Sequence, residues 1–160
     1  MAWDEGDDGI PLNSLISERL WQGGTDDEQT TLRGSKRLAA FNDAKPFDSV
    51  VTLSAHSLPM GWLVKEFRYA FNDGPLLPST IPQIEAVATW AHAQWKSGDR
   101  VLIRCQAGIN RSSLVTALVL MRDGKSAEEA IELISQRRSP DILSNIHFVD
   151  YLKGREFRNS

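Results

Sequence analysis

The sequence predicts a single α/β domain with a four- to five-stranded, mostly parallel twisted sheet and helices on both faces. Three observations lead to this fold class. The 160 residues, 41% hydrophobic and 24% charged, are enough for one full core. Short apolar runs of strand length occur among longer segments with helical periodicity. Helix caps, Gly and Pro separate these segments, and right-handed crossovers would join the parallel strands.

Four short segments are predicted to be strands, because they combine β-branched or aromatic residues with alternating or fully apolar patterns. The first is followed by a pair of glycines, and the third places Phe67, Tyr69 and Phe71 on one face. The last precedes the only cysteine of the chain. These segments are residues 17–22, 49–53, 66–71 and 101–103.

Four segments are predicted to be helices. A capping box at Thr80 with Pro82 in the first turn begins the first helix, and a second box at Ser126 begins the third. Gly124 stops the second helix, which is apolar all round and therefore buried, and Gly154 ends the last. The predicted helices cover residues 81–96, 112–121, 127–137 and 144–153.

The remaining segments are predicted to be irregular. Residues 1–14 form an acidic arm, residues 15–155 the folded domain and residues 156–160 a tail. Residues 25–47 are charged, and we favour a solvated surface segment, with an irregular helix as the alternative. Residues 55–65 are a loop that would border the pocket of the candidate site.

Composition argues against several classes of function. A net charge of −3 argues against a general binder of nucleic acids or membrane surfaces, which needs a basic face. No run reaches the roughly 20 apolar residues of a membrane span, and the acidic start has no signal-peptide pattern. Cys105 is the only cysteine, so internal disulfides and cysteine-rich zinc sites are excluded. These features favour a reducing, cytoplasmic location.

The candidate functional site is the loop between the strand at 101–103 and the following helix. Backbone N–H groups of such a loop converge, and the positive end of the helix points to the same place, which makes an anion site. A thiol at the start of this loop ionises more readily, because the loop dipoles and Arg111 favour the thiolate. Gly108 allows a sharp turn close to a ligand, and Arg111 offers a planar fork for two phosphate oxygens. Cys105 is therefore the candidate nucleophile, and Ser112 the candidate donor to its departing sulfur.

The alternative is an ordinary buried cysteine before a helix. Given a cysteine, chance places Gly three, Arg six and Ser seven positions later on the order of once in several thousand cases. The spacing therefore favours phosphoryl transfer to sulfur.

Asp73 is the candidate general acid. It follows the strand at 66–71, and in a parallel sheet the residues beyond the carboxyl ends of the strands meet at one edge, where the Cys105 loop also lies. A carboxylic acid there would protonate the leaving oxygen. The alternative is a turn residue, because Asn-Asp-Gly-Pro at 72–75 is a sequence typical of turns.

The loop resembles the signature of cysteine-dependent protein tyrosine and dual-specificity phosphatases, which is His-Cys, five residues, then Arg and Ser or Thr. The match comprises Cys105, Gly108, Arg111 and Ser112. The departure is Arg104, where the family usually has the His that helps to hold the loop.

Two further regions share this resemblance. The family carries its acid Asp on a loop before the cysteine, at a distance that Asp73, 32 residues before Cys105, matches. Residues 137–152 resemble the closing pattern of Arg, Pro, Asn and Phe. The resemblance covers about residues 15–155.

The resemblance implies a dual-specificity protein phosphatase that hydrolyses phosphomonoesters through a cysteinyl-phosphate, with no metal and no cofactor. Cys105 would attack phosphorus, Asp73 would protonate the leaving group and then act as base, and Ser112 would ease thiolate departure. The expected partners of this monomer are proteins carrying phosphotyrosine, phosphoserine or phosphothreonine, because the short chain implies a shallow cleft. The phosphate would be held by Arg111 and the backbone of Gln106, Ala107, Gly108, Ile109 and Asn110.

Two other functions stay open. The Gly-x-Asn-Arg ending of the loop also resembles cysteine-dependent RNA 5′-triphosphatases, which generally work without the acid aspartate. Because nucleic-acid partners are not expected for this acidic chain, that function ranks second. Arg104 leaves open a third function, a phosphate-binding module without turnover.

The other titratable side chains are interpreted as structural. His56, His92 and His147 lack the spacing of metal ligands, so no metal site is predicted. Arg137 and Arg138 are interpreted as helix-end charges, with a contact to an acidic substrate as the alternative.

Overall fold

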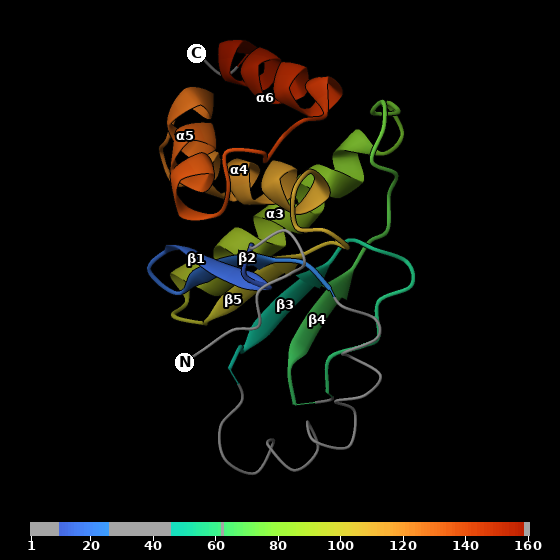
Figure 1. Cartoon of the computed structure of the whole chain (residues 1–160), viewed down its shortest axis with the longest axis vertical. Helices are drawn as coiled ribbons and strands as arrows, with labels where there is room; N and C mark the ends of the chain where they lie inside the picture. The colour runs from blue at the N-terminus through green and yellow to red at the C-terminus, as the bar shows by residue number, and fades with distance from the viewer. Residues whose placement is uncertain (1–9, 26–45, 62, 159–160) are drawn as a thin grey trace.

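The computed structural model describes residues 10–25, 46–61 and 63–158 (Figure 1). Its strands are β1 (Asn13–Ser17), β2 (Leu20–Gly23), β3 (Ser49–Thr52), β4 (Lys65–Arg68) and β5 (Val101–Arg104). Its helices are α3 (Ile81–Lys96), α4 (Arg111–Arg122), α5 (Ala127–Arg137) and α6 (Ile146–Arg158). None of these described helices has the length and apolar character needed to cross a membrane.

The five strands form one sheet in the order β1-β2-β5-β3-β4. β1 is antiparallel to β2 and all other neighbours are parallel, which confirms the predicted mostly parallel sheet. Pairing aligns the last residues of four strands: Gly23 with Arg104, Arg104 with Thr52, and Thr52 with Arg68. The segments that follow these strands therefore start from one edge, the edge at which parallel sheets bind ligands.

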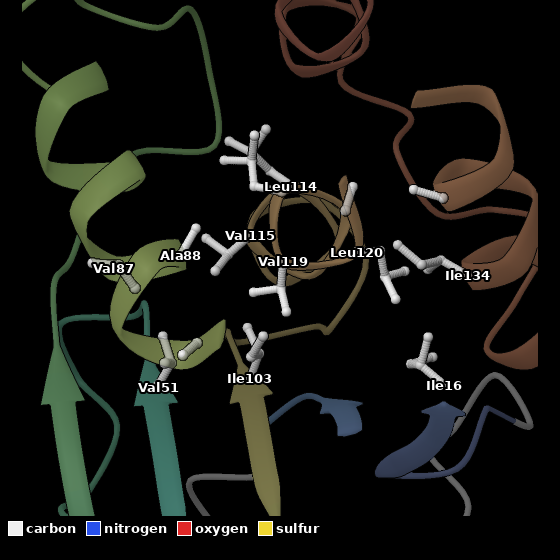
Figure 2. Packing of buried hydrophobic residues seen from close by; sticks show 14 of the residues in the cluster. Ile16, Val51, Val87, Ala88, Ile103, Leu114, Val115, Val119, Leu120 and Ile134 are labelled. Carbon is white, nitrogen blue, oxygen red and sulfur yellow. The ribbon is translucent and has the colours of Figure 1, made fainter. Parts of the chain in front are cut away.

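The described helices lie over one face of the sheet (Figure 1). α4 is at the centre of this layer, between α3 and α5, and α6 packs against α4 and α5. Figure 2 shows Val115 of α4 beside Ala88 of α3, and Val119 above Ile103 of β5. Residues 112–120 of α4 are all buried, which confirms the buried helix predicted from the apolar run at 114–121, although Met121 at the end of that run is only partly buried.

The second face of the sheet carries a smaller apolar cluster. Its buried members are Phe47, Val50 and Leu102. No helix of the described part of the chain covers this face. Residues 26–45, which include most of the predicted surface segment, lie outside the described residues.

The N-terminal strand differs from the prediction. Instead of one strand at 17–22, the chain forms the β1–β2 hairpin, whose turn falls at Glu18 and Arg19. Arg19 has a φ of 62°, a turn conformation that interrupts the alternation of side chains. β1 begins at Asn13, inside the segment 1–14 that the sequence assigns to the arm. Residues 1–9 of that arm lie outside the described part.

The end of the last helix is also corrected. α6 continues past Gly154 and into the predicted tail at 156–160. Gly154 is not among the glycines with positive φ, so it continues the helix. Arg155, the next residue, donates from Nε to Glu85 Oε1 of α3 at 2.6 Å, and this contact favours a helix that extends beyond the glycine.

The two predicted capping boxes have different outcomes. Ser126 and Glu129 form the reciprocal hydrogen bonds of a full box at the start of α5. Thr80 makes no side-chain cap hydrogen bond at the start of α3, so the box predicted there is wrong.

β4 is shorter than the predicted strand at 66–71. It ends at Arg68 because its partner β3 ends opposite, at Thr52. The aromatic residues at 67, 69 and 71 nevertheless share one face, as predicted, and all pack against the core on the helix side.

Candidate active site

The loop from Cys105 to Asn110 connects β5 to α4 at the carboxyl edge of the sheet. Cys105 is the first residue after β5, and its backbone N–H donates to Gly23 O at 3.2 Å. Only 2% of Cys105 is exposed. The predicted local order of strand, cysteine loop and buried helix is therefore confirmed.

Two backbone donors hold the ends of this loop. The N–H of Thr25 donates to Gln106 O at 2.8 Å, and the N–H of Leu143 donates to Ile109 O at 3.1 Å. These donors belong to the segment after β2 and to the segment between α5 and α6. Parts of the chain that are distant in sequence therefore draw both carbonyls away from the centre of the loop.

Two buried side chains hold the middle of the loop. Arg138 Nε donates to Gly108 O at 2.8 Å, and Arg138 Nη2 donates to Ala107 O at 3.4 Å. Gln22 Nε2 also donates to Gly108 O, at 3.2 Å. Arg138 is 7% exposed and Gln22 is 0% exposed. All four carbonyls from 106 to 109 are thus bonded to donors outside the loop.

The N–H groups of the loop turn inward as a consequence. In a trans peptide the N–H points opposite to the preceding carbonyl, so outward carbonyls leave the next N–H groups facing the centre. The N–H groups of Gly108 and Ser112 point at Cys105 Sγ, with N···S distances of 3.2 and 3.4 Å. Ser112 Oγ is 3.3 Å from the same sulfur. Converging N–H groups at a helix start form an anion site.

Gly108 is required at its position for two reasons. Its φ is 72°, in the left-handed region that favours glycine. A Cβ at this position would overlap Arg138 Nη2 and lie 2.7 Å from the backbone of Gly23. The sharp turn predicted from the sequence is present, and the loop also packs too closely on β2 to admit a side chain.

Arg138 corrects an interpretation from the sequence. It is not a surface charge at a helix end: its Nη1 donates to Pro11 O at 2.7 Å and to Ser14 Oγ at 3.0 Å, on and before β1. Arg138 therefore joins the loop to the N-terminal hairpin, whereas its neighbour Arg137 is exposed. The sequence signal for this role was the resemblance of residues 137–152 to the closing pattern of the family, which contains an Arg. No local signal marks Gln22 as a loop contact.

A hollow of about 400 Å³ opens beside the loop. Arg111 lines it, and Arg111 Nη1 donates to Phe71 O at 3.2 Å and to Leu53 O at 3.4 Å. These contacts hold the guanidinium against the segments that follow β3 and β4. The other lining residues are Thr25, Ser54, Ala55, His56, Ser57, Ala70, Phe71, Asn72 and Gln106.

Asp73 lies at the same edge of the sheet, as predicted, next to the hollow but outside its lining. Asp73 Oδ2 accepts a hydrogen bond from Asn110 Nδ2 at 2.9 Å, and Asp73 Oδ1 accepts one from Asn145 Nδ2 at 2.8 Å. Because Asn110 belongs to the loop, the carboxylate is tied directly to it. Sequence reasoning did not single out Asn145, although the closing pattern contains its Asn.

Arg104, the departure from the family signature, has a side chain that is only 4% exposed. Its Nε donates to Thr52 Oγ1 at 3.0 Å, and its Nη2 donates to Leu58 O at 2.7 Å. The same Nη2 lies 3.4 Å from Glu66 Oε2. Arg104 therefore links the strand before the cysteine to β3, to β4 and to the loop that follows β3.

The three histidines lie apart. His56 lines the hollow, His92 Nε2 is 3.2 Å from Asp123 Oδ1, and His147 is exposed near the start of α6. Within the described ranges, no group of three His, Cys, Asp or Glu side chains has an arrangement that could hold a metal ion.

Comparisons with known proteins give the family. The family of the dual specificity phosphatase catalytic domain matches residues 35–158. Dual specificity protein phosphatase 1-A of Xenopus laevis is 48% identical over 57 residues, which are 35% of this chain and 15% of that protein. Protein 123R of Invertebrate iridescent virus 6, which has the name of a tyrosine phosphatase, is 34% identical over 70 residues. That match covers 43% of this chain and 49% of the viral protein, so the matched part spans at most about half of either relative.

Solved structures agree on the fold. The crystal structure of human DUSP28 superposes with a TM-score of 0.73 at 22% identity, covering 93% of this chain and 95% of that chain. The single α/β domain predicted from the sequence is thereby confirmed. With the signature loop in place and the family matched over residues 35–158, the chain belongs to the dual specificity phosphatase catalytic domain family.

Proposed function

We propose that this chain is a cysteine-dependent phosphatase that hydrolyses phosphomonoesters on proteins. The observation that carries the proposal is the orientation of the loop: its carbonyls are bonded outward, and two N–H groups point at Cys105 Sγ. Such a loop stabilises negative charge at its centre, first on the thiolate and then on the oxygens of a bound phosphate. Family membership supports the same chemistry.

In the first step, Cys105 Sγ attacks phosphorus, and the S–P bond forms while the bond to the leaving oxygen breaks. Arg111 and the N–H groups of the loop bind the other phosphate oxygens. Asp73 gives its proton to the leaving oxygen, a role that typically contributes about 10²–10⁴-fold. Asn110 Nδ2 donates to Asp73 Oδ2 at 2.9 Å, so the loop that carries the nucleophile also holds the acid.

In the second step, water attacks the cysteinyl-phosphate, and the S–P bond breaks to release inorganic phosphate. Asp73, now ionised, takes the proton of the attacking water and returns to its acid form. Ser112 Oγ, 3.3 Å from the sulfur, donates a hydrogen bond to the departing thiolate. The enzyme ends the cycle in the protonation state in which it began, and no cofactor takes part.

The hollow supports a broad protein substrate class. Besides Arg111 and Gln106 from the cysteine loop and the rings of Phe71 and His56, its wall consists of short side chains such as Ser54, Ala55 and Ala70. A wall of short side chains admits both the aryl group of phosphotyrosine and the shorter phosphoserine and phosphothreonine. We therefore propose dual specificity.

The test is hydrolysis of p-nitrophenyl phosphate by the reduced protein in excess chelator, from about pH 5 to 8. We expect turnover that survives chelation and declines at both ends of this range. Cys105→Ser should abolish it, and wild-type turnover in that variant would refute the proposal. Because Cys105 is the only cysteine, mass spectrometry of a quenched reaction identifies the phosphorylated intermediate, which should accumulate in Ser112→Ala.

The two other functions give different results with the same protein. An RNA 5′-triphosphatase would release phosphate from triphosphorylated RNA faster than from a phosphopeptide, and Asp73→Asn would leave that rate unchanged. A binding module would bind a phosphopeptide without turnover. The hydrogen bond between Asp73 and the loop residue Asn110 favours the phosphomonoesterase, because it joins an acid to the candidate nucleophile's loop.

A further inference from the structure

A charged cluster lies on the face of the sheet that the described helices leave open. Val101 and Ile103 of β5 belong to the core on the helix side, whereas Leu102 belongs to the cluster on the second face. By the alternation of a strand, Arg104 shares the face of Leu102. Its partners Thr52 and Glu66 stand on β3 and β4, next to it across the sheet.

This cluster is buried and closely connected. The side chains of Arg104 and Glu66 are 4% and 11% exposed. Thr52 receives the hydrogen bond from Arg104 Nε at 3.0 Å and donates to Glu66 Oε2 at 2.5 Å. Arg68 Nη1 adds an ion pair to Glu66 Oε2 at 3.1 Å. A buried ion pair loses its hydration, and this destabilises the fold unless the remaining donors and acceptors of the pair are also hydrogen-bonded.

Those remaining groups bind one segment of backbone. Arg104 Nη2 donates to Leu58 O at 2.7 Å, and Arg68 Nη2 donates to Ser57 O at 2.5 Å. Glu66 Oε1 accepts from the N–H of Met60 at 3.3 Å. Three backbone groups between residues 57 and 60 therefore depend on side chains of β4 and β5.

The same segment is continuous with one wall of the hollow. Residues 54–57 line the hollow together with Arg111 and residues 70–72. The hydroxyl groups of Ser54 and Ser57 are hydrogen-bonded to each other, so a shift of Ser57 carries Ser54 with it. Arg104 therefore joins this wall to the strand that ends at the candidate nucleophile.

We propose that Arg104 and Glu66 are positioning residues for the wall at residues 54–60 and thereby determine how tightly the substrate binds. This inference rests on the proposed phosphatase function. The pair acts on binding of the group that carries the phosphate, and leaves the bond-making steps at the sulfur unchanged. Arg104, whose side chain is longer than the His of the family signature, makes these contacts to Leu58 O and Glu66.

The other end of the same strands offers a matched control. Arg100, directly before β5, pairs with Asp48, directly before β3, at 3.2 Å. This pair also joins β5 to the chain at β3, but it lies at the opposite end of the strands from the cysteine loop. Asp48→Asn removes an ion pair that is more exposed than the pair of Arg104 and Glu66, and it does so without touching the wall.

The experiment compares Glu66→Gln, Arg104→His and Asp48→Asn. For Glu66→Gln and Arg104→His we expect the KM for a phosphotyrosine peptide to rise about tenfold, with kcat on p-nitrophenyl phosphate within about twofold of wild type. Amide exchange at Met60 should accelerate in Glu66→Gln. Asp48→Asn should change neither KM nor this exchange rate, although it lowers the melting temperature.

Several outcomes would overturn the inference. Equal loss of melting temperature in all three variants with unchanged KM would mean that the pair is only structural. A fall in kcat on both substrates with unchanged KM would mean that Arg104 acts on the cysteine loop instead. Arg104→His introduces the residue of the family signature. Its KM and kcat therefore decide between these two results even if Glu66→Gln folds poorly.

Different measurements would refute this inference and the proposed function. If the wild-type protein hydrolyses neither substrate, the proposed function fails. The positioning role is then still decided by amide exchange at Met60 and by the dissociation constant of the phosphotyrosine peptide. Unchanged values of both in Glu66→Gln would refute it.

Discussion

The loop around Cys105 has two sides that are held in different ways. On the inner side, Gln22 and Arg138 are buried and donate to the carbonyl of Gly108. On the outer side, Asp73 is exposed, and it is held by the side-chain amides of Asn110 and Asn145. The inner contacts come from a strand and a helix end, and the outer ones from loops and the start of α6.

The difference separates two requirements of the proposed reaction. The inner side fixes the direction of the loop N–H groups, and buried hydrogen bonds in a low-dielectric interior resist displacement. The outer side must exchange protons with a leaving group and with water, so it has to be solvated. We therefore expect inner changes to affect stability and activity together, and outer changes to affect one step of catalysis.

Gly108→Ala should give the largest effect, because it acts on the inner side at its tightest point. The new Cβ would overlap Arg138 Nη2 and the backbone of Gly23, in addition to the strain of a positive φ. We expect kcat/KM to fall by about 100-fold or more, since misplacement by about 1 Å has that effect on positioned groups. Thermal unfolding should show a loss of about 3 kcal/mol.

Gly124→Ala is the control for this prediction. Gly124 also has a positive φ, of 107°, but nothing lies within 4 Å of an added Cβ. It should cost about 1–2 kcal/mol and leave kcat/KM unchanged. If both variants lose the same stability and retain activity, close packing of the loop on β2 does not support catalysis.

Arg138→Met should give the second largest effect. It removes the donor that Arg138 provides to the carbonyl of Ala107 and breaks the link to Pro11 and Ser14. We expect a loss of about 3 kcal/mol in unfolding free energy and a fall of about tenfold in kcat/KM. Arg137→Met, one residue earlier and exposed, should stay within about 0.5 kcal/mol of wild type. Equal effects of the two variants would remove the distinction between the inner side and an ordinary helix end.

These inner residues mark the limit of what the sequence reveals about the site. Cys105, Gly108, Arg111 and Ser112 are contiguous, so local spacing and the chemistry of each residue are sufficient to predict their loop. Arg138 acts across 30 residues, and its sequence neighbourhood is that of a helix end, so its charge suggests solvent exposure. Its burial depends on tertiary packing of the hairpin against the loop.

The fold shows the same division. Helices α4 and α5 follow from apolar periodicity and a capping box, which are local signals. The β1–β2 hairpin depends on a polar turn at Glu18 and Arg19, inside a stretch whose alternation also fits a single strand. The length of α6 depends on Arg155, whose partner Glu85 lies on another helix. The hairpin and the end of α6 both need a distant partner, and for both the prediction from sequence is wrong; the capping box at Thr80 is a local signal that also fails.

Asn145→Ser tests the outer side and should affect one step only. Serine retains an acceptor for the N–H of His147, so the start of α6 stays capped, but the amide donor to Asp73 is lost. We expect kcat on a phosphoserine peptide to fall about tenfold, because its alkoxide leaving group needs the acid. Hydrolysis of p-nitrophenyl phosphate, whose leaving group needs little protonation, should change less than about twofold. Equal losses on both substrates would show that Asn145 supports the loop itself, as the inner side does.

Glu85→Gln should give the smallest effect, because it removes a carboxylate that is remote from both sides of the loop. Glu85 joins α3 to α6 through Tyr151 and Arg155, each at 2.6 Å. Burial raises the pKa of this carboxyl, but hydrogen bonds from Arg155, Tyr151 and Arg122 outweigh it and lower the pKa below 4.5. A lowered pKa means that the ionised form stabilises the fold above pH 4.5 and that this contribution disappears as the pH falls through the lowered value.

Denaturant unfolding of Glu85→Gln and wild type, measured from about pH 7 to about pH 3, should therefore show a loss of about 1 kcal/mol in the variant at neutral pH, which vanishes at the acid end. kcat/KM should be unchanged. A change in kcat/KM would mean that the packing of α6, which begins beside Asn145, transmits to the outer side of the loop.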